Sequence, residues 1–170
     1  EDSGPSNAPN GDLAGNVWGA GFQPGWLDFD DDGDLDLYVV NDMGKYLQPN
    51  VLWRNDGPSI ERTWKFTDVS QESGADVSMF GMGLAVGDYD LDGRLDLFMT
   101  NIGHNVLLKN NDGASFTKTE VSAGVGKGLI GRKLRVAWGA VFFDYDNDGD
   151  EDLYVVSGYL SFSPRPIEEQ

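Results

Sequence analysis

Three short acidic segments constrain the fold of this 170-residue chain more than any other feature. They span residues 28–36, 88–96 and 144–152, and they hold 6, 4 and 6 acidic residues, which is 16 of the 29 in the chain. In each segment Asp occupies positions 1, 3, 5 and 9, and Gly occupies position 6. A merely solvated acidic surface does not need this repeated spacing. We call the segments Asp loops 1, 2 and 3 and expect one shared role for them.

Carboxylates held this close together repel one another. A like-charged pair at about 4 Å costs about 1 kcal/mol in water and about 4 kcal/mol near a protein surface. A folded loop of this kind therefore needs a cation. The chain has no Cys and a single His, and a site built only of oxygen donors favours calcium over zinc or copper.

The loop spacing also indicates which groups would bind the ion. Side chains at positions 1, 3 and 5 can point inward together, the Gly at position 6 permits a sharp turn, and position 7 is expected to offer its backbone carbonyl. One calcium ion is expected in each loop, three in all. The candidates are Asp28, Asp30, Asp32 and Asp34 in loop 1, Asp88, Asp90, Asp92 and Arg94 in loop 2, and Asp144, Asp146, Asp148 and Asp150 in loop 3.

An EF-hand has similar spacing, but the sequence excludes it. An EF-hand loop needs a bidentate Glu at position 12 and a helix on each side. Position 12 is Val39, Met99 or Val155 in the three loops. The segments that follow, 35–40, 95–100 and 152–156, are short β-branched and aromatic runs typical of strands.

The chain is repetitive beyond the loops, which start 60 and 56 residues apart. Residues 50–57 resemble residues 105–113, and the Asp-Gly pairs at 56–57 and 112–113 predict tight hairpin turns with positive φ. Four short antiparallel strands in about 55 residues indicate a propeller blade, hence an all-β fold. No helix is expected, and the segment 124–135 is expected to be a loop insertion.

The Asp-x-Asp-x-Asp-Gly-x-x-Asp loop after an apolar strand such as 80–87 resembles the FG-GAP/VCBS repeat, over roughly residues 14–160. Such repeats build the β-propellers of integrin α-subunits and of many secreted bacterial proteins, and the second repeat is especially similar to bacterial VCBS proteins and to cartilage acidic protein. The resemblance implies calcium ligands at positions 1, 3, 5 and 9 and at the position-7 carbonyl. It therefore adds Asp36, Asp96 and Asp152 to the candidates.

We expect residues 1–16 to form an N-terminal linker or an arm donated to a neighbour, and residues 17–170 to form the propeller segment. Its repeats are placed at about 17–75, 76–132 and 133–170. The third repeat lacks the Asn-Val-Leu hairpin of the other two, so we expect an incomplete blade. The chain is then a fragment of a longer propeller, or a second copy completes it by self-association.

Two further groups of residues allow more than one interpretation. The tryptophans are expected to pack in the core or in hairpin pairs, with sugar stacking as the alternative; they are Trp18, Trp26, Trp53, Trp64 and Trp138. The basic side chains between 127 and 135 are expected in a solvated loop, with docking on an acidic second copy as the alternative; they are Lys127, Arg132, Lys133 and Arg135.

The formal charge of −17 argues against a nucleic-acid partner, which needs a basic surface. No stretch approaches the roughly 20 apolar residues of a membrane span. The family resemblance and the calcium affinity expected of such loops imply a non-enzymatic extracellular calcium-binding propeller module for adhesion or for interaction with a protein or glycan. The alternatives are a self-assembling subunit of a fibre or surface lattice, and an accessory module of a larger secreted enzyme.

Overall fold

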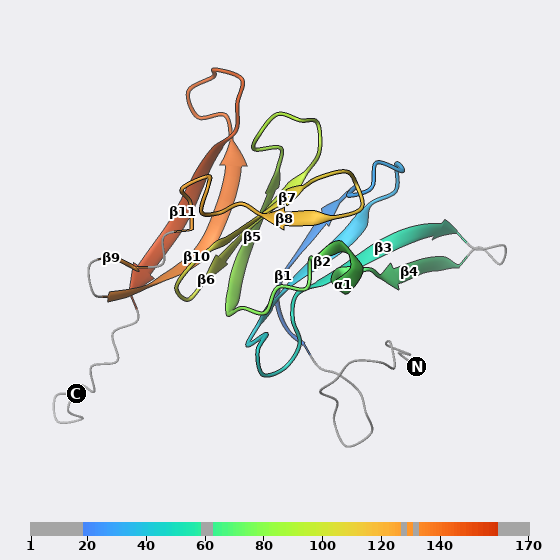
Figure 1. Cartoon of the computed structure of the whole chain (residues 1–170), viewed down its shortest axis with the longest axis horizontal. Helices are drawn as coiled ribbons and strands as arrows, with labels where there is room; N and C mark the ends of the chain where they lie inside the picture. Colours follow the sequence, from blue (N-terminus) through green and yellow to red (C-terminus); the bar gives the residue numbers. More distant parts are fainter. Residues whose placement is uncertain (1–18, 59–62, 127–128, 131–132, 160–170) are drawn as a thin grey trace, which may run out of the picture.

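The computed structural model describes residues 19–58, 63–126, 129–130 and 133–159, and these residues form three antiparallel sheets (Figure 1). Blade 1 has the order β1-β2-β3-β4, with β1 Ala20–Leu27, β2 Asp36–Asp42, β3 Val51–Pro58 and β4 Trp64–Asp68. Blade 2 has the order β5-β6-β7-β8, with β5 Gly81–Gly87, β6 Asp96–Asn101, β7 Val106–Asn110 and β8 Phe116–Lys118. Blade 3 has the order β11-β10-β9, with β9 Leu129–Ile130, β10 Lys133–Phe143 and β11 Asp152–Tyr159. The predicted all-β fold of propeller blades is confirmed.

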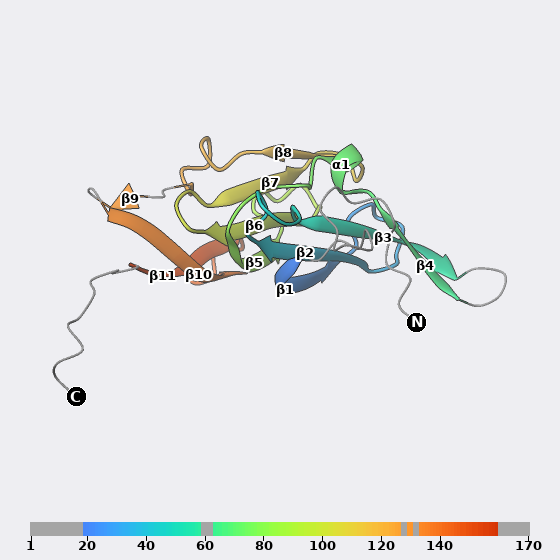
Figure 2. The same ribbon diagram turned by 90° about the horizontal axis from the view of Figure 1, so that it is seen from below.

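The blades pack side by side, with blade 2 in the middle (Figures 1 and 2). Successive residues of a strand point to opposite faces. Strands of blade 2 therefore contribute side chains to two hydrophobic layers, one shared with blade 1 and one shared with blade 3. In β6, Leu97 and Met99 pack into the layer shared with blade 1, whereas Phe98 packs into the layer shared with blade 3. The blade 1 layer also contains Tyr38 and Leu84.

A β-bulge recurs at the same place in the first strand of each blade. The register shifts between Gly21 and Gln23 in β1, between Gly81 and Gly83 in β5, and between Ala137 and Gly139 in β10. At the first bulge the Gln23 amide binds the backbone of the next blade. Its Nε2 donates to the Leu84 carbonyl at 3.1 Å, and its Oε1 accepts from the Leu84 N–H at 3.0 Å.

The three Asp loops and the strands that follow them lie at the predicted residues. Of the two hairpin turns predicted from Asp-Gly pairs, only one is confirmed. Asp112 and Gly113 do form the turn between β7 and β8, and Gly113 has φ 75°. Asp56 and Gly57 lie inside β3 instead, at a register shift between Asn55 and Pro58. Gly57 has positive φ there as predicted, because an irregular strand can require that conformation just as a turn does.

Three other expectations were wrong. The single helical turn α1, Ser70–Ser73, was not predicted; Gly74 ends it in the left-handed conformation. The segment 124–135 contains β9 and the start of β10 rather than only a loop. Trp26, Trp64 and Trp138 are exposed rather than in the core. Trp64 does lie opposite Pro58 in the β3–β4 hairpin, and Trp26 forms an edge contact with Phe66 at 6.4 Å.

The expected arm at 1–16, Trp18, Lys127, Arg132 and the end of the third repeat lie outside the described residues. Within the part that is described, no strand pairs with the outer edge of β11. The same part contains no helix with the length and apolar character needed to cross a membrane.

Candidate metal sites in the Asp loops

All three Asp loops join the first strand of a pair to the second and project from the same end of the sheets (Figure 1). The position-1 carboxylate closes each loop by accepting two backbone N–H groups. In loop 1 the Asp28 oxygens accept from the N–H groups of Asp32 at 3.1 Å and Gly33 at 3.0 Å. Asp88 and Asp144 accept the corresponding pairs at 2.8–3.1 Å. The repeated spacing therefore produces one repeated loop geometry.

Backbone conformation in the loops depends on positions 4 and 6. The position-6 glycines have φ of 90–95°, and a Cβ added at Gly33, Gly93 or Gly149 would meet no atom within 4 Å. The glycine is therefore required by its φ and not by lack of space. Position 4 also has φ near 60°, and it is occupied by Asp31, by Leu91 and by Asn147. This second left-handed position was not predicted, because its residue type differs among the three loops.

The position-9 aspartate fastens the loop to the neighbouring hairpin. Asp96 accepts the N–H of Tyr89 at 3.2 Å and that of Asn110 at 2.8 Å. Asp36 is also buried and accepts two backbone N–H groups in the same way. Burial raises the pKa of Asp96 to about 6, although both backbone hydrogen bonds act to lower it. Burial also raises the pKa of Asp36.

Each loop brings three carboxylates together so that one oxygen from each lies within 4.8 Å of the others. The groups combine positions 1, 3 and 5 in loop 1, and positions 1, 3 and 9 in loops 2 and 3. They are Asp28, Asp30 and Asp32; Asp88, Asp90 and Asp96; and Asp144, Asp146 and Asp152. Positions 1 and 3 belong to every group, whereas the third carboxylate comes from position 5 in loop 1 and from position 9 in loops 2 and 3.

The remaining candidates lie in the same loops with other contacts. The position-5 carboxylates accept the N–H of position 7, as Asp32 does from Asp34 at 2.9 Å and Asp148 from Asp150 at 3.2 Å. Asp92 likewise accepts the Arg94 N–H at 3.0 Å. The position-7 side chains do not belong to the carboxylate groups, and the role expected of their carbonyls stays a prediction.

The acidic groups of loop 1 fit a hard cation. The Oδ1 atom of Asp30 is buried and has no hydrogen-bond donor in the described part of the chain. Burial raises the pKa of the Asp30 carboxyl, and the nearby charge of Asp32 raises it further. A divalent ion would satisfy the oxygen and remove this electrostatic cost, and an all-carboxylate donor set suits calcium.

Loop 2 differs from loop 1 in having a basic side chain hydrogen-bonded directly to its carboxylates. The Lys109 ammonium on β7 donates to Asp92 at 2.8 Å and also to Asp90. These hydrogen bonds raise the pKa of Lys109 above its usual range and lower that of Asp92. The equivalent residue of blade 1, Arg54, binds Asp56 outside the loop. The contact of Lys109 with loop 2 was not predicted, because it depends on how the β6–β7 hairpin places a side chain that is distant in the sequence.

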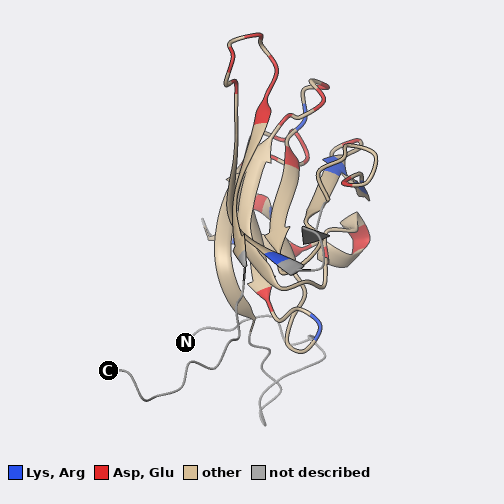
Figure 3. Ribbon diagram, turned by 90° about the vertical axis from the view of Figure 1, so that its left-hand side faces the viewer, with Lys and Arg blue, Asp and Glu red and all other residues tan. Residues whose placement is uncertain are grey.

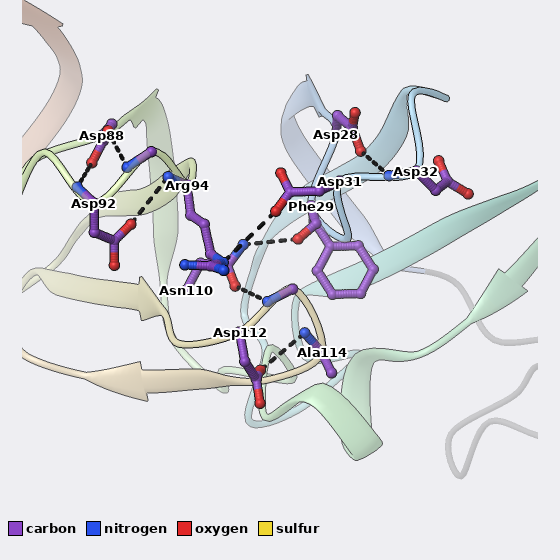
Figure 4. A network of polar contacts seen from close by, with 12 residues as sticks. Asp28, Phe29, Asp31, Asp32, Asp88, Asp92, Arg94, Asn110, Asp112 and Ala114 are labelled. Atoms are coloured by element: carbon purple, nitrogen blue, oxygen red, sulfur yellow. Dashed lines mark hydrogen bonds and ion pairs between the residues drawn. The ribbon is translucent and has the colours of Figure 1, made fainter.

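Loops 1 and 2 are linked to each other (Figure 4). The Arg94 side chain extends from loop 2 toward loop 1, where its Nε lies 3.7 Å from Asp31 Oδ2. Asn110 Nδ2 donates to the Phe29 carbonyl at 2.8 Å, and its Oδ1 accepts from the Gly113 N–H at 2.9 Å. The asparagine thus holds the blade 2 turn against loop 1.

Comparison with known families identifies the same repeating unit. The FG-GAP-like repeat family matches residues 28–99 and again residues 88–155. Each match begins at the first aspartate of an Asp loop, and together they cover about three quarters of the chain. No curated protein matches the chain.

Proposed function

The chain belongs to the FG-GAP-like repeat family, and from this premise we propose that it is an extracellular β-propeller module stabilised by calcium bound in its three Asp loops. The observation that carries the proposal is the grouping of three carboxylates within 4.8 Å in every loop. Such a group is costly without a cation. Three divalent ions would cancel six of the 17 net negative charges.

The residues have separate roles in this proposal. Position 1 shapes the backbone, since it accepts the two N–H groups that close the loop. Position 3 offers its oxygens to the ion, and position 9 connects the site to the hairpin of the same blade. A bound ion would thus fix the turn between the first two strands of a blade, which is a structural use of calcium.

The extracellular setting follows from the expected affinity. Calcium sites of extracellular modules typically have Kd values of about 10⁻⁴ to 10⁻³ M, and such sites fill only where calcium is abundant. We assign no catalytic step to the module, because its grouped carboxylates are those assigned to the metal. A protein or glycan ligand for adhesion stays a prediction.

Calorimetric titration of the chelated protein with calcium tests the proposal. We expect three bound ions per chain, together with stabilisation of about 2.7 kcal/mol per site at calcium 100-fold above Kd. The variants Asp30→Asn, Asp90→Asn and Asp146→Asn should each lose one ion. Position 3 is the sharpest choice because its carboxylate does not close the loop backbone.

The matched control is Asp76→Asn, which removes one exposed carboxylate outside the loops. It should still bind three ions. Calcium uptake below one ion per chain, with no rise in melting temperature, would contradict the proposal.

A further inference from the structure

We propose that a cavity between blades 2 and 3 binds a carboxylate ligand that carries a short aliphatic group. The cavity has a volume of about 290 Å³. Its lining residues are Asn105, Gly124, Val125, Arg135, Leu153 and Val155. Arg135 lies near the start of β10, whereas Asp loop 3 follows the end of that strand (Figure 1). The inference therefore goes beyond the proposed calcium sites and does not depend on them.

The equivalent place between blades 1 and 2 is filled by two methionines. Asn50 Nδ2 donates to the Met79 sulfur at 3.4 Å and to the Met99 sulfur at 3.1 Å. Both methionines are buried, and the Tyr38 hydroxyl also donates to the Met99 sulfur, at 3.2 Å. This junction is thus packed around an asparagine amide by uncharged, buried side chains.

Blades 2 and 3 have different residues at the positions of these methionines. Aligning the first aspartates of loops 2 and 3 places Arg135 where the preceding repeat has Met79. The same alignment places Val155 where that repeat has Met99. The counterpart of the asparagine is Asn105, which lines the cavity. Because Val155 is shorter than methionine and Arg135 is charged, the two replacements leave space at this junction and add a positive charge beside it.

The charge of Arg135 has no partner in the described part of the chain. Its Nε is buried and has no hydrogen-bond acceptor there. The structure describes three arginine side chains; Arg54 and Arg94 each pair with an aspartate, and Arg135 does not. Glu120, whose Oε2 is also buried without a donor, does not pair with it either. A buried charged donor without an acceptor is costly, and an external anion would satisfy it.

The other lining residues indicate which anion fits. A guanidinium binds a carboxylate through two parallel N–H···O hydrogen bonds. Val125, Leu153 and Val155 offer apolar contact to an aliphatic group, and walls of this kind are typical of small-molecule sites. The volume lies just below the range of about 300–1,000 Å³ found for drug-sized ligands. The ligand is therefore small, either a free carboxylic acid or the C-terminal residue of a peptide.

The charge distribution permits an anion at this place despite the net charge of −17. Figure 3 shows the acidic residues concentrated toward the Asp loops, with the strands mostly uncharged. Arg135 is eight residues before Phe143, the last residue of β10, which corresponds to a rise of about 26 Å. This distance is about three Debye lengths at physiological salt, so the repulsion from loop 3 is largely screened.

An NMR titration of the isotope-labelled chain with isobutyrate tests the proposal. We expect shifts of the Arg135 Nε–H signal and of the Val125, Leu153 and Val155 methyl signals, with a Kd of about 1 mM for so small a ligand. Isobutyramide has the same shape without the charge and should bind at least about tenfold more weakly.

A second pair of probes distinguishes the two sources of the carboxylate. It consists of N-acetyl-glycyl-valine with a free C-terminal carboxylate and the same peptide with a C-terminal amide. The acid should again bind at least about tenfold more tightly than the amide. Tighter binding of the peptide acid than of isobutyrate assigns the site to peptide C-termini, and the reverse order assigns it to free small acids.

The variant Arg135→Met introduces the residue of the preceding repeat. It should abolish isobutyrate binding and raise the melting temperature of the ligand-free protein by about 2–4 °C, because it fills the cavity and removes a buried unpaired charge. Val155→Met retains the charge and should weaken binding at least about tenfold by filling the cavity. The control Lys118→Met removes an exposed charge outside the cavity and should change neither quantity.

Two results would overturn the proposal. Equal binding of acid and amide, or no binding of any probe, would show that the cavity does not recognise a carboxylate. A lower melting temperature of Arg135→Met would show that the guanidinium is satisfied within the protein, by Glu120 or by another carboxylate of the same chain.

Discussion

Leu91 shows how strictly the Asp loops impose a backbone conformation on single residues. It adopts φ 59° at position 4, where loops 1 and 3 have Asp31 and Asn147. Asp and Asn tolerate this region because their short polar side chains bond locally, but a left-handed leucine costs about 1–2 kcal/mol. The conformation persists because the surrounding hydrogen bonds of Asp88 determine it.

Leu91→Asn should therefore stabilise the protein by about 0.5–1 kcal/mol. Little packing is lost, because Leu91 is 59% exposed. Chemical denaturation measures the change. Leu35→Asn is the control, since Leu35 is similarly exposed in loop 1 but does not have positive φ. An equal effect of both variants would contradict a conformational cause.

Lys109 sets the electrostatics of loop 2 through its contacts with Asp90 and Asp92. Its ammonium competes with a calcium ion for the same oxygens, so loop 2 should be the weakest of the three sites. Lys109→Gln is expected to tighten calcium binding at loop 2 by at least about fivefold, which is about 1 kcal/mol of removed repulsion.

The measurement is a calcium titration in the background of Asp30→Asn and Asp146→Asn, which leaves loop 2 as the intact Asp loop. Lys65→Gln is the control, because Lys65 pairs with Asp56 on the β3–β4 hairpin and not with a loop. An unchanged loop 2 affinity in the Lys109 variant would refute the competition while leaving calcium binding itself intact.

Strands and turns explain why the fold was easier to predict than its connections. The runs after each loop became β2, β6 and β11, because β-branched and aromatic residues suit a half-buried pleated surface. The turn predicted at Asp56-Gly57 was wrong because the same dipeptide suits both a turn and a bulge. Asn55 and Asn110 are equivalent residues of the repeated segments 50–57 and 105–113, but only the three-dimensional arrangement shows that Asn110 joins two blades.

Asn110→Ala should destabilise the protein by about 2 kcal/mol or more. The variant removes the partners of two buried backbone groups, the Gly113 N–H and the Phe29 carbonyl, and each unsatisfied group costs about 1–3 kcal/mol. Urea unfolding gives the value. The adjacent Asn111→Ala, whose bonds to Ser115 and Thr117 are exposed, should cost about 0.5 kcal/mol. Equal losses would contradict a special role for the buried amide.

For the molecule as a whole, the dominant long-range force is repulsion among 29 acidic residues opposed by only 12 basic ones. The composition shows this imbalance directly, and 16 of the 29 acidic residues lie in the three Asp loops. The sequence could not show that Trp26 and Tyr154 are exposed in this structure, because both lie in strands where aromatic residues are typical of the core.

Added salt should therefore stabilise the calcium-free protein. Raising the NaCl concentration from 20 to 500 mM shortens the Debye length and screens the repulsion, so the melting temperature should rise by about 2–4 °C, equivalent to about 1 kcal/mol. With saturating calcium the rise should be smaller, because the loops are already neutralised. Equal salt effects with and without calcium would indicate that the loops are not the source of the repulsion.

The Gln23 amide clamp on Leu84 has no equivalent between blades 2 and 3, because position 23 corresponds to Gly83 in the next repeat. A Cβ at Gly83 would lie 2.7 Å from the Trp138 carbonyl, so that junction is closed by bare backbone instead. The backbone contacts of this second junction include a bridge between Ile102 and Val136 and a hydrogen bond from the Gly103 N–H to the Arg135 carbonyl at 2.8 Å. A side chain larger than hydrogen at position 83 should thus force blades 2 and 3 apart, whereas loss of the Gln23 amide loosens only the junction between blades 1 and 2.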